Sequence, residues 1–158
     1  ALLMLSKIEN QQFKDKEEVV FNTVVKTMIS DFSSILEFKS IELDLIENGE
    51  FKTIINKDLA YSLLSNLFKN AIKHNTNNGK IIIELDNHSL KIKNNSNRKT
   101  PLNSRDIFNR FYKESGDQLS TGLGLSIVKT IVDHHSNINI YYDFEDPFHI
   151  FSLKNKNS

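Results

Sequence analysis

Apolar residues recur at three- and four-residue spacing in three stretches of the chain, and this pattern predicts three main amphipathic helices. The first prediction covers residues 17–38, and the third covers residues 122–135. The second helix begins after Asn56 or Asp58, either of which can cap it, and ends at His74. Its buried stripe is expected to comprise Leu59, Leu63, Leu64, Leu67, Phe68, Ala71 and Ile72.

Alternation of apolar and polar residues predicts six strands, at 41–45, 51–55, 80–85, 89–93, 138–142 and 148–153. Asn48 and Gly49 favour a hairpin that joins the first two. A polar loop with Pro101 is expected to lead into a short helix over 105–112. Helix stripes must cover an apolar sheet face, so the fold class is α+β, a two-layer α/β sandwich with a mixed, mostly antiparallel sheet under about three helices.

Composition limits the class of protein and the kind of partner. The 158 residues fit one domain, and 39% apolar with 25% charged residues is ordinary for a soluble globular protein. Lys and Arg together number 20, as do Asp and Glu, so no net charge favours binding to nucleic acid. No apolar run is long enough to span a membrane. The absence of cysteine excludes disulfides and thiolate metal sites.

A pair of glycines opens the third predicted helix. Gly122 and Gly124 precede main-chain N–H groups that have no partner within the helix, and glycine permits close approach of an anion. The arrangement is compatible with phosphate binding. Taken alone, such a glycine pair is more often a requirement of the turn.

One edge of the second predicted helix is polar. Asn66 and Asn70 lie one turn apart, and Lys73 follows on the same side. Amide oxygens suit Mg²⁺, and a lysine offsets phosphate charge. The alternative is an ordinary solvated helix face.

Three motifs, in order, resemble those of sensor histidine kinases, whose catalytic domain belongs to the superfamily of Bergerat (GHKL) ATPases. Residues 66–74, Asn-Leu-Phe-Lys-Asn-Ala-Ile-Lys-His, resemble the N box of that family. Residues 107–113, Ile-Phe-Asn-Arg-Phe-Tyr-Lys, are similar to its F box. Residues 121–129, Thr-Gly-Leu-Gly-Leu-Ser-Ile-Val-Lys, resemble its second glycine box. The resemblance covers about residues 58–132 and extends weakly upstream to residues 2–10.

The resemblance implies an ATP site with Mg²⁺. It makes Asn70 the metal ligand, Asn66 a polar partner, and Lys73 a phosphate contact, and these three are the expected catalytic residues. Residues 113–121 would form a lid over the nucleotide, and Phe108 and Phe111 would anchor it by packing. The remaining residues expected at the nucleotide or its lid are His74, Asn94, Ser96, Phe108, Phe111, Thr121, Gly122, Leu123, Gly124 and Leu125.

The first glycine box of the family, Asp-x-Gly, has a different sequence here. Asn94-Asn95-Ser96 stands in its place. An amide oxygen still accepts a hydrogen bond from the amino group of adenine, but without the strength that a carboxylate adds. Ser96 also lacks the ready access of glycine to positive φ. Ser120 replaces the first glycine of the second box.

The expected function is transfer of the γ-phosphoryl group of Mg-ATP to a histidine that this chain lacks. None of its five histidines fits a phosphoacceptor helix. Residues 1–12 are expected to end a truncated dimerisation helix and residues 13–158 to form the catalytic domain. His134 and His135 stand at the end of a predicted helix, where histidine is favoured by the negative pole of the helix, and this explains the pair better than a metal site does. Expected partners are the protein's own dimerisation domain and a response regulator; the piece should be a cytoplasmic monomer of a protein in the bacterial inner membrane.

Two other functions are weighed. The same fold serves ATPases in which a Glu activates water, but Asn66 at that position cannot accept the proton, which argues against an efficient ATPase. The altered first glycine box motivates the alternative of an interaction module with impaired nucleotide binding.

Overall fold

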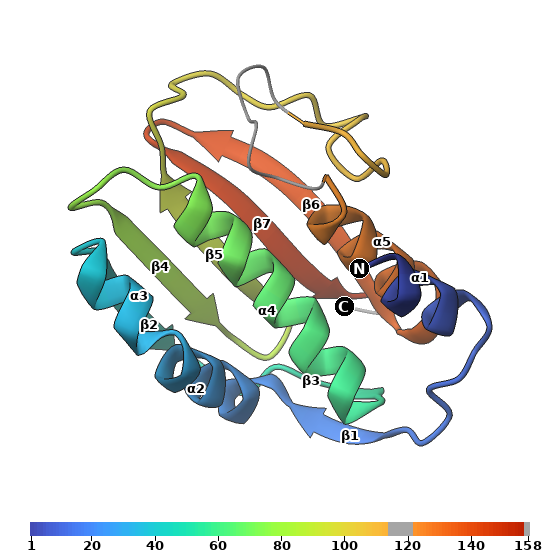
Figure 1. Cartoon of the computed structure of the whole chain (residues 1–158). Helices are drawn as coiled ribbons and strands as arrows, with labels where there is room; N and C mark the ends of the chain where they lie inside the picture. The colour runs from blue at the N-terminus through green and yellow to red at the C-terminus, as the bar shows by residue number, and fades with distance from the viewer. Residues whose placement is uncertain (114–121, 157–158) are drawn as a thin grey trace.

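The computed structural model describes residues 1–113 and 122–156 (Figure 1). Helices and strands alternate along the chain without a long run of either. The elements are α1 (Leu2–Glu9), β1 (Glu17–Val20), α2 (Phe21–Asp31), α3 (Ser33–Phe38), β2 (Glu42–Glu47), β3 (Lys52–Ile55), α4 (Lys57–Lys73), β4 (Lys80–Leu85), β5 (Ser89–Asn95), α5 (Gly124–His135), β6 (Ile138–Glu145) and β7 (Phe148–Asn155).

The main sheet has five strands in the order β2-β4-β5-β7-β6. Only β2 and β4 are parallel, and the other neighbours are antiparallel. Helices α4 and α5 cross one face of this sheet, α2 lies beside α4, and α1 lies beside α5 (Figure 1). The predicted two-layer α+β architecture, with a mixed and mostly antiparallel sheet, is confirmed.

Helix α4 forms the centre of the core. The side-chain oxygen of Asn56 accepts hydrogen bonds from the main-chain N–H groups of Asp58 at 2.9 Å and Leu59 at 3.1 Å, a cap worth about 1 kcal/mol. All seven residues of the predicted stripe are buried. Capping and the stripe together confirm this helix. Even so, neither α4 nor any other helix in the described residues is long and apolar enough for a membrane span.

The prediction of one helix over 17–38 is wrong at its start and in its middle. Residues 17–20 form β1, which pairs antiparallel with β3 in a separate two-stranded sheet. The remaining residues divide into α2 and α3 at Phe32, whose ring packs edge-on against Phe68 at 5.4 Å between centroids. The helical spacing of apolar residues continues across this break, so periodicity alone could not locate it.

The predicted hairpin of residues 41–55 is also wrong, because β2 pairs with β4 and β3 pairs with β1. Side chains from outside the turn form hydrogen bonds with its main-chain groups. Asn22 donates to the carbonyl of Gly49 at 3.0 Å and accepts from the N–H of Phe51 at 3.0 Å, and Asn87 accepts from Glu50 at 3.1 Å. These contacts turn β3 away from β2.

Two further boundaries differ from the prediction. Residues 105–112 form successive turns rather than a short helix, and α5 begins at Gly124, two residues later than expected. Asn103 starts those turns, because its side chain accepts from the N–H of Arg105 at 3.1 Å and donates to Asp106 at 2.8 Å. Such local bonds compete with helix formation.

The turn between β4 and β5 provides a test of stability against pH. Main-chain N–H groups of His88, at 2.7 Å, and Ser89, at 2.8 Å, donate to the Asp86 carboxylate and lower its pKa, with the His88 bond the largest cause. The folded pKa is below the unfolded one, so this stability is present above the unfolded pKa and is lost as pH falls through the folded pKa.

Asp86→Asn keeps an acceptor for the turn but cannot titrate. We expect the unmodified protein to be more stable than this variant at neutral pH, and the difference to disappear in acid. Urea unfolding of both proteins across this pH range measures the difference. A difference that grows in acid would contradict the assignment.

Candidate active site

A cavity of about 410 Å³ lies where the polar edge of α4 faces the start of α5 and strands β5 and β7. It collects residues that are far apart in the sequence. Its lining consists of Ala1, Asn66, Lys69, Asn70, Lys73, His74, Asn94, Ser96, Arg98, Leu102, Ile107, Tyr112, Lys113, Gly122, Gly124, Leu125, Ile127, His149 and Phe151.

The charges around this cavity are of one sign. Four cationic side chains line it, from Lys69, Lys73, Arg98 and Lys113, and the described lining contains no carboxylate. Apolar side chains form much of the remaining wall. A site with several cations beside an apolar wall suits a ligand with a polyanionic end and a flat apolar end.

The polar edge of α4 supplies two amides. Asn66 donates to the main-chain carbonyl of Ser62 at 2.7 Å, so its orientation is fixed by its own helix. Asn70 is half-buried and lines the cavity, and its side chain has no hydrogen bond to any residue in the described part of the chain. Its amide is therefore available to a ligand.

The start of α5 faces the same cavity. Gly124 and Leu125 both line it, and no side chain caps the first turn of the helix. A Cβ added to Gly124 would lie 3.5 Å from the side-chain oxygen of Asn66, so the two elements approach closely here. Main-chain N–H groups of this first turn thus reach the cavity, as an anion requires.

Gly122 has a different role, which is to close the base of the loop before α5. Its φ is +73°, and an added Cβ would lie 2.6 Å from main-chain atoms of Phe111. The N–H of Phe111 donates to the carbonyl of Gly122 at 2.8 Å, and Phe111 itself has φ +64°. Only glycine fits at 122, because any side chain would collide with that backbone.

The altered glycine box lies at the other end of the cavity. Asn94 is 2% exposed, and its side-chain nitrogen donates to the carbonyl of Asn95 at 3.1 Å, which leaves the amide oxygen as the acceptor for a ligand. Ser96 does not have positive φ, and its hydroxyl accepts from the N–H of Arg98 at 3.0 Å. The loop thus adopts a form that needs no glycine at 96.

Several lining residues were not expected from the sequence. His149 and Phe151 reach the cavity because β7 pairs with β5, which places His149 opposite Asn94. Arg98 and Leu102 come from the loop after β5. Lys69 could have been found, since it lies three residues after Asn66 on the same helix. Strand pairing decides the positions of His149 and Phe151, and no local pattern shows it.

Three of the expected site residues that the structure describes are not in the lining. Phe108 packs edge-on against Phe151 at 6.2 Å between centroids, so it supports the wall from behind. Phe111 is 61% exposed and contributes its backbone rather than a packed ring, in contrast to the expected anchor. Leu123 points into the core. Thr121, with most of the expected lid (114–121), lies outside the described residues.

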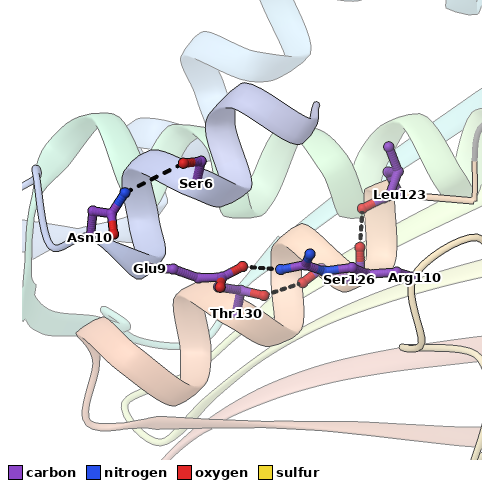
Figure 2. Close-up of polar contacts among 7 residues, drawn as sticks. All are labelled: Ser6, Glu9, Asn10, Arg110, Leu123, Ser126 and Thr130. Carbon is purple, nitrogen blue, oxygen red and sulfur yellow. Dashed lines mark hydrogen bonds and ion pairs between the residues drawn. The ribbon is translucent and has the colours of Figure 1, made fainter.

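Helix α1 lies beside α5 (Figure 2). Arg110 extends over α5 and forms an ion pair with Glu9. The buried His135 bonds through Nε2 to the carbonyl of Ile8 at 3.0 Å. This contact gives His135 a structural role, and no cluster of three or more metal-binding side chains occurs among the described residues.

Comparison with known proteins identifies the family. Residues 55–154 match the model for "Histidine kinase-, DNA gyrase B-, and HSP90-like ATPase". The heme sensor protein HssS of Staphylococcus saprophyticus is 32% identical over 149 residues, which cover 89% of this chain and 32% of that protein. HssS of Staphylococcus aureus strain Newman is 35% identical over 145 residues, which cover 87% of this chain and 31% of that protein. The chain spans about a third of the length of these relatives.

Solved structures of histidine kinases share the fold. AdeS of Acinetobacter baumannii aligns with a TM-score of 0.74 at 24% identity, over 98% of this chain and 74% of that one. The catalytic domain of ThkA aligns with a TM-score of 0.77 at 22% identity, and the alignment covers 89% of this chain and 95% of that one. The structure of ThkA in complex with the response regulator TrrA aligns with a TM-score of 0.72 at 22% identity, and this alignment covers 98% of this chain and 46% of that one.

The fold, the family match and the relatives agree with the resemblance of the three motifs. The chain belongs to the family of histidine kinase-, DNA gyrase B- and HSP90-like ATPases, and it has the fold of histidine kinase catalytic domains.

Proposed function

We propose that this domain transfers the γ-phosphoryl group of ATP to a histidine on a dimerisation domain. The observation that carries the proposal is one cavity that joins the amide of Asn70, four cations and the start of α5. The attacking imidazole nitrogen forms a bond to the γ-phosphorus while the bond to the oxygen that bridges β and γ breaks, and ADP leaves. Such a reaction depends mainly on positioning and charge stabilisation.

Each end of the cavity has a distinct task. Main-chain N–H groups at the start of α5, with Lys73, hold the phosphate oxygens, and the amide oxygen of Asn94 accepts a hydrogen bond from the amino group of adenine. His74 lies at the end of α4 and lines the cavity, so it would contact a bound nucleotide. Gly122 closes the base of the loop and so sets where α5 begins.

The residues present fit Mg²⁺ as a cofactor. The half-buried amide of Asn70 offers a hard oxygen without a competing partner in the described residues. Asn66, fixed by Ser62, lies one turn before it. When bound, Mg²⁺ would supply charge neutralisation between phosphate groups. A single protein ligand is consistent with the preference of Mg²⁺ for water and phosphate oxygens.

The same residues argue against efficient ATP hydrolysis. A general base must take a proton from water, and the amide of Asn66, which already donates to Ser62, cannot do so. The reading as an interaction module has less support, because the cations and the start of α5 around the cavity are intact.

We also propose the location and the partners of the parent protein. The parent protein is a membrane sensor with this domain in the cytoplasm, residues 1–12 end its dimerisation helix, and a response regulator receives the phosphoryl group. The relatives, about three times as long, and the complex of ThkA with TrrA support this arrangement. The piece by itself is expected to be monomeric.

Restoring the acidic residue is expected to strengthen adenine binding. Asn94→Asp replaces the amide acceptor with a carboxylate, and the charge-assisted bond should tighten ATP binding about fivefold. Calorimetric titration of ATP measures the change. Asn97→Asp adds the same charge at an exposed position off the cavity and should leave the affinity unchanged. Weaker binding by the Asn94 variant would show that this amide does not face adenine.

A further inference from the structure

Asn94 faces His149 across the β5–β7 pair, at the end of the cavity assigned to the base. The loop segment 98–102, which follows the altered glycine box, forms the cavity wall at this end through Arg98 and Leu102. We infer that His149 and Tyr142 are positioning residues for the nucleobase: they hold the segment 98–102 in place. The inference rests on the proposed function and adds residues to its site.

Both ring nitrogens of His149 have hydrogen-bond partners. Its Nε2 lies 2.9 Å from the carbonyl of Arg98, which can only accept, so Nε2 carries the proton. Nδ1 lies 2.7 Å from the hydroxyl of Tyr142, and that hydroxyl accepts from the main-chain N–H of Leu102 at 3.0 Å. In the neutral imidazole, Nδ1 accepts a hydrogen bond from the Tyr142 hydroxyl. Each of these five groups has a partner.

This chain of hydrogen bonds joins the loop to the sheet at two points. His149 is only 3% exposed, so water cannot readily replace its bonds. Arg98 and Leu102, whose main-chain groups it holds directly and through Tyr142, both line the cavity. The position of this wall therefore depends on two side chains from the hairpin of β6 and β7.

Contacts within the loop complete the support. The hydroxyl of Ser96 accepts from the N–H of Arg98, and the guanidinium of Arg98 donates to the carbonyls of Thr100 at 3.2 Å and Pro101 at 2.8 Å. These contacts shape the loop but do not attach it to the sheet. The bonds from His149 and Tyr142 do attach it to the sheet, and they are thus expected to set the distance between the wall and Asn94.

Two substitutions at His149 separate this role from simple packing. His149→Leu removes both bonds, and His149→Gln restores an amide nitrogen that can donate to the carbonyl of Arg98. We expect the Leu variant to bind ADP about tenfold more weakly and the Gln variant to regain most of the loss. The stabilising effect of Mg²⁺ on ADP binding should be the same in all three proteins, because the change is at the base end.

Calorimetry with ADP, with and without Mg²⁺, gives these affinities for the complete chain. Equal ADP affinity of the Leu variant and the unmodified protein would overturn the inference, as would equal weakening by Leu and Gln or a lost Mg²⁺ effect. If the Leu variant does not fold, Tyr142→Phe, which keeps the ring, is expected to weaken ADP binding severalfold, and unchanged binding would overturn the inference. Failure of the unmodified protein to bind ADP would instead overturn the proposed function, and this inference with it.

Discussion

Replacing Asn70 with Ala is expected to reduce phosphotransfer by on the order of 10²-fold or more, and to remove the dependence of ATP affinity on Mg²⁺. Asn70 is the half-buried amide of the cavity without a partner in the described residues, so it is the side chain best placed to ligate the metal. Without this amide the metal ion would be lost, and the negative charges of the phosphate groups would no longer be neutralised during transfer. Transfer of labelled phosphate from ATP to an added dimerisation domain measures the effect.

Asn137→Ala is the matched control, because it removes an exposed amide beyond the far end of α5, away from the cavity. Its activity should equal that of the unmodified protein. Thermal unfolding of the Asn70 variant should also be unchanged, since the residue lies on the polar edge of α4 rather than in its stripe. Undiminished phosphotransfer by the Asn70 variant would exclude this residue as the metal ligand.

Gly122→Ala is expected to impair both stability and nucleotide binding. Alanine at φ +73° costs about 1–2 kcal/mol, and its Cβ would lie 2.6 Å from the backbone of Phe111, so that the loop base must open. The melting temperature should fall by about 3–8 °C. ATP affinity should fall at least tenfold, because the start of α5 moves with the loop base.

Gly124→Ala provides the comparison for stability. A Cβ there would lie at an ordinary contact distance of 3.5 Å from Asn66, and the residue opens a helix without positive φ. The melting temperature of this variant should match or exceed that of the unmodified protein. Equal melting temperatures for the two alanine variants would contradict the role of Gly122 at the loop base.

Local signals predicted α4 well, and the residues of its predicted polar edge line the cavity. Its cap, its stripe and its polar edge all depend on residues within one helix, so the sequence contains the whole pattern. The same is true of Gly122 and Gly124 before α5. Helix periodicity and motif spacing are sufficient where the structure is made from neighbouring residues.

Contacts between distant segments could not be predicted. The partners of β2 and β3 depend on Asn22 and Asn87, which take the hydrogen bonds of the intervening turn. His149 reaches the cavity only because β7 pairs with β5. Phe111 was expected to pack, but its backbone, not its ring, closes the loop. Alternation identifies a strand without naming its neighbour.

Calorimetric titration of the unmodified protein with Mg-ATP tests the central claim most directly. One saturable site with micromolar to millimolar affinity, reduced in the Asn70→Ala variant, is the predicted result. Absence of binding at millimolar ATP would contradict the account and would favour an interaction module that no longer holds nucleotide.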